Sequence, residues 1–215
     1  FRMVQTSQTD LILGTAYEGT LVGSGQSQLF RLVTSAHSPL RLLLDDSSNA
    51  NHNELYAQLG SPPTRSDYSY RFREPASADQ EILIPAAPPG SWYLLVYSEA
   101  TPEPGNYSLL AQSADLFISS ITPDRHGDSQ DATLTITGAG FDAMTTVELV
   151  APETTVYPGT LGDITTTTQL TATFFVGSVP PNVYSVRVSR PDADPVEVSD
   201  AFELIAGGEA NLEFN

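Results

Sequence analysis

The chain has 215 residues, of which 26 are acidic and 9 basic, and it contains no cysteine. The net charge of −17 without a basic cluster argues against binding to nucleic acid or to anionic lipid. The missing cysteine excludes disulfides, thiolate catalysis and cysteine-ligated metals.

Membrane insertion is not expected, because no apolar run approaches the ~20 residues that a membrane helix needs. The chain begins at Phe1 and shows no signal peptide. We therefore expect a processed protein or an excised fragment whose targeting segment has been removed.

The first half consists of short apolar or alternating runs separated by Gly, Pro, Asn, Asp and Ser clusters. Long stretches with helical spacing of apolar residues are missing, so the pattern predicts a β-sandwich or barrel. The predicted strands are Glu18–Val22, Gln28–Thr34, Leu40–Leu44, Glu54–Gln58, Tyr68–Arg73, Glu81–Ile84, Ser91–Tyr97 and Asn106–Ala111.

Two spaced motifs mark this half. Glu54–Thr64 reads as an acidic residue, Leu-Tyr, a strand and Gly-x-Pro-Pro-Thr, and Gly90–Tyr97 is followed by a closing Tyr107-Ser108-Leu109 strand. Over residues 10–112 the chain resembles the bacterial pre-peptidase C-terminal (PPC) family. The resemblance implies a jelly-roll-like sandwich attached to secreted hydrolases, in which some relatives bind calcium or a polymer such as collagen. The family's Gly-Asp-x-Asp is Gly25–Gln28 here, so calcium binding does not carry over to that loop.

A composition shift near Ser113–Asp115 suggests a second domain. The two halves carry net charges of −5 and −12. We expect domains at 1–113 and 114–206, followed by a strand-like tail over 207–215. Strands of the second half are predicted at Leu116–Ile121, Ala132–Thr137, Thr146–Val150, Leu170–Val176, Val183–Val188 and Val196–Leu204.

The second half has motifs of its own. Ile118–Pro123 precedes a strand that ends in Gly138-Ala139-Gly140-Phe141, and Val183–Val188 supplies a closing strand. Over residues 116–205 this half resembles IPT/TIG domains, although the usual Gly-Gly before the second strand is replaced by Asp128–Asp131. The resemblance implies an immunoglobulin-like sandwich that serves as a spacer or interaction module. The predicted fold class is therefore all-β, with two tandem β-sandwiches, jelly-roll-like and then immunoglobulin-like.

One polar segment is a candidate calcium site, because calcium prefers six to eight hard oxygen ligands. The alternative interpretation is a polar hairpin loop. A second acidic loop with Asp124, Asp128 and Asp131 has the same two interpretations. The candidate ligands of the first segment are Asp45, Asp46, Asn49, Asn51, Asn53 and Glu54.

Two features suggest partner binding. Tyr68 and Tyr70 are candidates for exposed aromatic contacts, the alternative being that they pack the sandwich. Leu212 and Phe214 alternate in the tail, which could pair with the sheet edge of a neighbouring subunit or extend the sheet of its own domain.

Catalysis is not expected. His37, His52 and His126 lie in polar loops, no Gly-x-Ser-x-Gly elbow is present, and the paired acids Asp45-Asp46 and Asp192/Asp194 lie in turns. We expect a non-catalytic binding or spacer module of a secreted or cell-surface bacterial protein, with a protein or polysaccharide partner. One alternative is a subunit that forms a surface fibre by terminal strand exchange, and a weaker one is a fragment of a secreted hydrolase.

Overall fold

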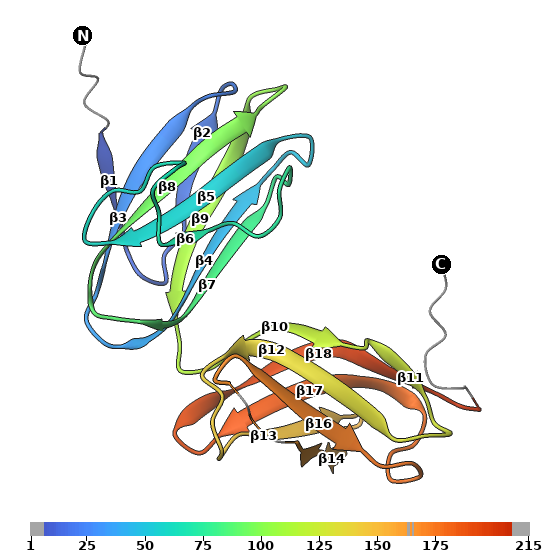
Figure 1. The fold of residues 1–215 in the computed structure, drawn as a ribbon. Helices are drawn as coiled ribbons and strands as arrows, with labels where there is room; N and C mark the ends of the chain where they lie inside the picture. Colours follow the sequence, from blue (N-terminus) through green and yellow to red (C-terminus); the bar gives the residue numbers. More distant parts are fainter. Residues whose placement is uncertain (1–6, 163, 165, 208–215) are drawn as a thin grey trace. The chain divides into compact units, whose positions relative to one another are not determined.

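The computed structural model describes residues 7–162, 164 and 166–207. This part of the chain contains strands and no helix, and hence no helix long and apolar enough to cross a membrane. The chain divides into two compact units, Phe1–Ala114 and Asp115–Asn215, each with its own core (Figure 1). The predicted all-β fold class is confirmed.

The first unit is a sandwich of two sheets, with strand orders β1-β3-β8-β5-β6 and β2-β9-β4-β7. Its strands are β1 (Gln8–Leu11), β2 (Tyr17–Leu21), β3 (Ser27–Thr34), β4 (Ser38–Asp46), β5 (His52–Leu59), β6 (Tyr70–Arg71), β7 (Gln80–Ala87), β8 (Gly90–Ala100) and β9 (Gly105–Ser113).

The pairing in this unit is nested. Antiparallel pairs join β2 to β9, β3 to β8, β4 to β7 and β5 to β6, as if one long hairpin had been rolled up. Such nesting in two packed sheets is the jelly-roll arrangement. The first strand, β1, adds parallel to β3 with Gln8 opposite Leu29, so this N-terminal segment extends a sheet of its own unit.

Alternation along the strands builds the first core. On β8, Trp92, Leu94 and Val96 are almost fully buried, while Tyr93 and Leu95 on the other face are half-buried. This agrees with the two-residue period of side chains in a strand. The expected strand Tyr68–Arg73 is shorter than predicted, because only Tyr70 and Arg71 pair with β5 and the flanking residues form loops.

The second unit also has two sheets, with strand orders β10-β12-β16-β15 and β11-β18-β17-β13-β14. Its strands are β10 (Phe117–Thr122), β11 (Arg125–Gly127), β12 (Ala132–Ala139), β13 (Thr146–Val150), β14 (Val156–Pro158), β15 (Thr160–Leu161), β16 (Gln169–Phe174), β17 (Asn182–Arg190) and β18 (Ala193–Ile205).

This strand order is that of an immunoglobulin-like sandwich, in which the first strand divides between the two sheets. A second hallmark is the tyrosine corner, where a buried tyrosine near the start of the sixth main strand bonds to the backbone just upstream. Tyr184 on β17 is fully buried, and its hydroxyl donates a hydrogen bond to the carbonyl of Pro180.

The Gly-x-Gly-Phe motif has a steric cause. A Cβ on Gly138 would lie 1.9 Å from the carbonyl oxygen of Phe117, and one on Gly140 would lie 1.9 Å from that of Asp115. Gly140 also has a φ of +84°, which side chains disfavour. Both glycines therefore let β10 and the residues before it approach the end of β12 closely, where Phe141 enters the core.

Replacing Tyr184 with Phe tests the tyrosine corner. The ring stays in place, but the carbonyl of Pro180 loses its donor, so we expect the second unit to lose about 1–2 kcal/mol of unfolding free energy. The control is Tyr157→Phe, whose ring packs 5.8 Å from that of Tyr184. Urea unfolding followed by circular dichroism measures both, and equal stabilities of the two variants would contradict a structural role for the hydroxyl.

Candidate functional site

The outer face of β5 is covered by the segment between β5 and β7. Tyr56 points outward from β5, yet only 4% of it is exposed. Its ring centroid lies 5.0 Å from that of Tyr68 and 5.6 Å from that of Phe72. This segment therefore builds a second layer of aromatic side chains on the outside of the sandwich.

An ion pair anchors that layer. The Nε and Nη2 atoms of Arg65 each lie 2.6 Å from one carboxylate oxygen of Glu54, and the Tyr56 hydroxyl donates to the same carboxylate at 2.8 Å. The Arg65 guanidinium also lies 4.2 Å from the centroid of the Tyr97 ring. A bidentate arginine–carboxylate pair fixes direction as well as distance, so Arg65 is held over the sheet in one orientation.

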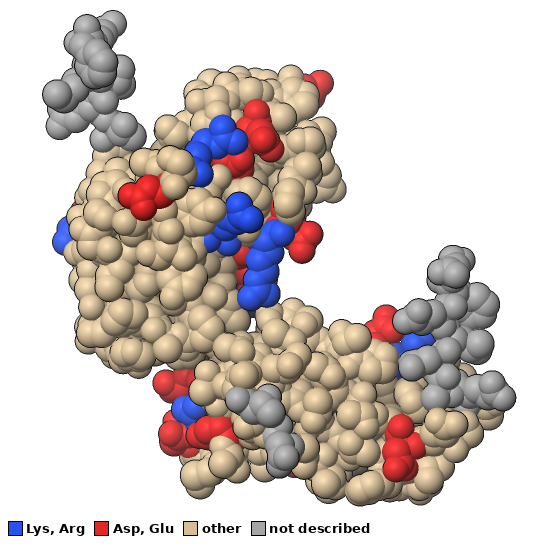
Figure 2. Space-filling view, in the orientation of Figure 1, with Lys and Arg blue, Asp and Glu red and all other residues tan. Residues whose placement is uncertain are grey.

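Arg71 and Arg73 differ from the other arginines. Arg71 lies 5.9 Å from the centroid of the Tyr68 ring, and both arginines are exposed. Among the described residues, six arginines form ion pairs, and these two form none. Figure 2 shows basic side chains gathered on the face of the first unit that carries β5 and β6. We call Tyr56, Arg65, Tyr68, Arg71 and Tyr97 the Tyr–Arg face.

The structure separates the two tyrosines that the sequence grouped. Tyr68 is half-buried within the Tyr–Arg face, whereas Tyr70 is half-buried against the core, with its ring 6.0 Å from that of Trp92. The tail residues Leu212 and Phe214 lie outside the described residues.

A second group of polar side chains lies between the two sheets of the first unit. Asp46 ends the inward-facing series Leu40, Leu42, Leu44 on β4, and Asn53 begins the inward-facing series of β5. The Asp46 carboxylate accepts hydrogen bonds from Asn53 Nδ2 at 2.7 Å and from Asn51 Nδ2 at 3.0 and 3.1 Å. A buried polar bridge thus connects β4 in one sheet to β5 in the other.

Gln80 joins this group from β7, and the sequence analysis did not identify it. Its Nε2 donates to the backbone carbonyls of Asn53, Glu74 and Ser77 at 2.9, 2.7 and 3.1 Å. Gln80 is 3% exposed and faces the core, next to Leu44 in the pairing of β4 with β7. We call Asp46, Asn51, Asn53 and Gln80 the inter-sheet polar cluster.

The structure does not bring the other proposed calcium ligands to this cluster. Asp45 points to the opposite face of β4 and is exposed, and Asn49 is exposed in the turn that follows. Glu54 points to the outer face of β5, where Arg65 and Tyr56 occupy its oxygens. In the part of the chain that the structure describes, no three His, Cys, Asp or Glu side chains gather as a metal site.

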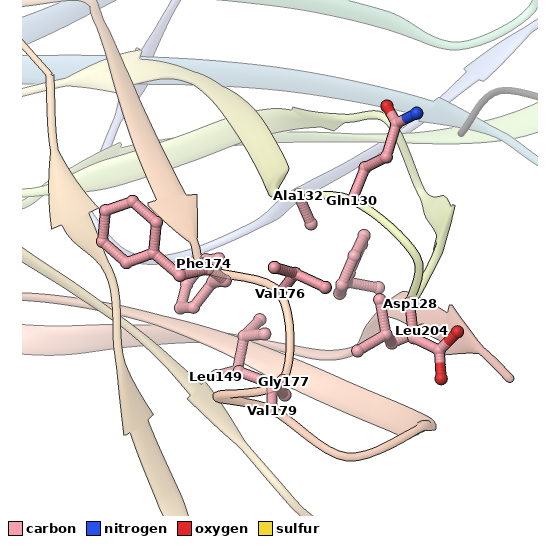
Figure 3. Close-up of a pocket in the computed structure, with 11 residues that line it drawn as sticks. Asp128, Gln130, Ala132, Leu149, Phe174, Val176, Gly177, Val179 and Leu204 are labelled. Carbon is pink, nitrogen blue, oxygen red and sulfur yellow. The ribbon is translucent and has the colours of Figure 1, made fainter. Parts of the chain in front are cut away.

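In the second acidic loop, the carboxylates of Asp128 and Asp131 accept hydrogen bonds from the backbone of other segments. Asp128 accepts a hydrogen bond from the backbone of Gly207, and Asp131 accepts one from that of Val176, each at 2.8 Å. Asp128 also lines a small hollow at one end of the second sandwich, whose other lining side chains are mostly apolar, such as Phe174 and Leu204 (Figure 3). These carboxylates therefore hold loops in place.

The three histidines lie in or next to three different strands. His37 is exposed just before β4, His52 is half-buried at the start of β5, and His126 lies buried in β11 of the second unit. The Nδ1 atom of His126 lies 2.7 Å from the carbonyl oxygen of Gly127. The segment around His126 was expected to be a loop, but it pairs in parallel with the end of β18, with His126 opposite Leu204.

Comparison with known proteins gives partial matches only. No family model and no curated protein matches the chain. The pre-peptidase C-terminal domain of a Bacillus anthracis collagenase is 16% identical, with 51% of this chain and 99% of that one covered and a TM-score of 0.43. The g-type lysozyme inhibitor PliG of Aeromonas hydrophila is 14% identical, with 50% and 96% covered and a TM-score of 0.37. A biofilm-associated BSP domain is 8% identical, with 90% and 52% covered and a TM-score of 0.29. At these scores, none of the matches assigns a function to this chain.

The Tyr56–Glu54 bond predicts a pH dependence. Burial, together with the hydrogen bond to Glu54, raises the pKa of Tyr56 to about 12 from its ordinary value of 10.0. Because the folded state holds this proton more tightly than the unfolded state, the resulting stability is complete below pH 10 and is lost as the pH rises towards 12.

We expect the urea midpoint of the first unit, followed by the fluorescence of Trp92, to fall less steeply between pH 9 and 11.5 in Tyr56→Phe than in the wild type. Tyr93→Phe, which leaves the bond to Glu54 intact, serves as the control and should follow the wild type. Identical slopes for all three proteins would show that the Tyr56 proton is not linked to folding.

Proposed function

We propose that this chain is a non-catalytic binding module of a secreted or cell-surface bacterial protein. The Tyr–Arg face of the first unit contacts a polypeptide partner, and the second unit serves as an immunoglobulin-like spacer. The sequence motifs that resemble the PPC and IPT/TIG families support the extracellular placement and the spacer role.

The observation that carries the proposal is Arg71, an exposed arginine without an ion pair to a described residue, whose guanidinium lies 5.9 Å from the ring of Tyr68 in a preformed aromatic layer. Arg73, which is also exposed, follows two residues later in the chain. The core of the sandwich does not require this layer, since Tyr56, Tyr68 and Tyr97 lie on the outside of the sheet. Tyrosine and arginine are enriched at the residues that contribute most to protein–protein binding. The rings of Tyr56 and Tyr68 already pack against each other, and Arg65 already lies over the ring of Tyr97, which lowers the entropy lost on binding.

The charge of the exposed arginines predicts that the partner contributes acidic side chains to the contact. Arg71 and Arg73 form no ion pair with a described acid, so a carboxylate of the partner can pair with them without breaking an existing contact. Arg65 is different, because it is bound to Glu54 and lies 3.6 Å from Glu99. We therefore expect Arg71 and Arg73 to contribute binding energy. Arg65, in contrast, is expected to fix the positions of the side chains in the Tyr–Arg face.

The test compares wild-type protein with the double variant Arg71→Ala/Arg73→Ala. Partners are captured from bacterial surface and culture-medium extracts, purified and titrated by calorimetry. Loss of Arg71 from the Tyr–Arg face, together with Arg73 two residues later in the chain, should raise Kd about 10- to 100-fold. The control is Arg125→Ala, an exposed arginine of the second unit that pairs with Glu203 at 2.8 Å.

The control should bind within about twofold of the wild type, because single exposed ion pairs contribute little. A partner that binds the double variant as tightly as the wild type would remove the Tyr–Arg face from the proposal. Turnover of a substrate by the purified chain would contradict its non-catalytic assignment.

A further inference from the structure

The inter-sheet polar cluster contains more buried hydrogen-bond acceptors than donors. In the described part of the chain, four buried side-chain polar atoms have no hydrogen-bond partner, and three of them belong to this cluster. They are Asn51 Oδ1, Asn53 Oδ1 and Gln80 Oε1, on residues that are 0%, 1% and 3% exposed. A buried acceptor that is left unpaired has given up its water without gaining a new partner, which is unfavourable, so three in one cluster indicate a missing binding partner.

The cluster also carries negative charge without a cation. Asp46 is 3% exposed and forms no ion pair with any described residue. A second carboxylate is close, because Asp79 Oδ1 accepts a hydrogen bond from the Asp46 backbone nitrogen at 2.8 Å. Buried carboxylates are usually paired with a cation or a metal. The amide donors that face Asp46 are neutral and leave its charge in place.

We propose that the inter-sheet polar cluster binds one divalent cation, Ca²⁺ in preference to Mg²⁺, through the side-chain oxygens of Asp46, Asn51, Asn53 and Gln80. All four are hard oxygen donors, with no nitrogen or sulfur ligand of the kind that zinc prefers. Ca²⁺ accepts amide and carboxylate oxygens in flexible geometry and completes its shell with water, whereas Mg²⁺ demands a near-octahedral arrangement.

The side-chain amide groups can reorient between the cluster without an ion and the cluster with a bound cation. Without an ion, the nitrogens of Asn51 and Asn53 face the Asp46 carboxylate. Asn53 Nδ2 also donates to the backbone carbonyl of Ala78 at 2.8 Å, and a bound ion has to offset the loss of this hydrogen bond. A half-turn of an amide about its last side-chain bond exchanges nitrogen and oxygen and presents the oxygen instead. The cation then takes over from the amide hydrogens in compensating the charge of Asp46, and the unpaired oxygens become ligands.

The backbone around the cluster leaves little room for other side chains. A Cβ on Gly105 would lie 3.2 Å from Asn51 Nδ2 and 3.3 Å from Asp46 Oδ1. The turn after β4 is closed by Asp46 itself, whose Oδ1 accepts the Ser48 backbone nitrogen at 2.9 Å. The residues of the cluster are thus held by three strands and a tight turn before any ion binds, so only the amide groups have to reorient on binding.

The experiment titrates the full 215-residue chain, freed of metal with EDTA and dialysed, with CaCl₂ and separately with MgCl₂ in a calorimeter. Thermal unfolding of the first unit is followed through Trp92, the chain's one tryptophan. We expect one Ca²⁺ per chain with a Kd of about 10⁻⁴–10⁻³ M, as in extracellular modules. At a hundredfold excess over Kd, the melting temperature of the first unit should rise by about 10 °C.

A matched pair of variants locates the ion. Asp46→Asn should weaken Ca²⁺ binding at least tenfold, while Asp45→Asn, which removes the same charge from the exposed face of the same strand, should bind within about threefold of the wild type. Asn53→Asp adds a second buried carboxylate, so its melting temperature in EDTA should lie below that of the wild type. Addition of Ca²⁺ should then raise its melting temperature by more than it raises that of the wild type.

The alternative occupant is water, since buried waters commonly satisfy unpaired acceptors. A hydrated cluster predicts no heat with CaCl₂ up to 10 mM and the same melting temperature in Ca²⁺ and EDTA, and that result would overturn the proposal. So would equal Ca²⁺ affinities of Asp46→Asn and Asp45→Asn. The wild-type titration decides the question even if Asp46→Asn fails to fold.

Discussion

A hydrogen bond joins the two sheets of the first sandwich inside its apolar core, from Asn53 of β5 to the buried carboxylate of Asp46 on β4. Alternation places this carboxylate between the sheets: Leu40, Leu42 and Leu44 face the core, so Asp46, two residues further on the same strand, faces it too. A carboxylate in that position is stable only if donors or a cation reach it, and the turn between β4 and β5 brings Asn51 for that purpose.

Strand β5 contributes side chains both to the interior of the first unit and to its surface. Asn53 and Leu55 of β5 point between the sheets, whereas Glu54 and Tyr56 point outward. A single strand thus positions both the polar cluster and the base of the Tyr–Arg face. Occupation of the cluster would fix the start of β5 and, through Glu54, the Arg65 guanidinium that lies over Tyr97. The two proposals are independent in their tests, yet they share this physical support.

Patterns within one strand made most of the fold predictable from the sequence, and contacts between distant segments made the rest unpredictable. The long strands β3, β8 and β17 were expected because alternation and turn residues are local signals. The parallel pairings of β1 and β11 were not expected, since three or four residues carry no period. The calcium ligands predicted from the sequence were close neighbours in the chain, so they included Glu54, which alternation places on the outer face of β5. Gln80 lies 27 residues after Asn53, so no local pattern in the sequence could connect it with the cluster.

A double-mutant cycle on Asp46 and Asn53 tests most directly whether this bond holds the two sheets together. Asp46→Ala, Asn53→Ala and the double variant are unfolded with urea in EDTA, and Trp92 reports the stability of the first unit. The account predicts a coupling free energy of about 1.5–3 kcal/mol, the range of a hydrogen bond to a charged group. Additive effects of the two substitutions, with a coupling near zero, would contradict it.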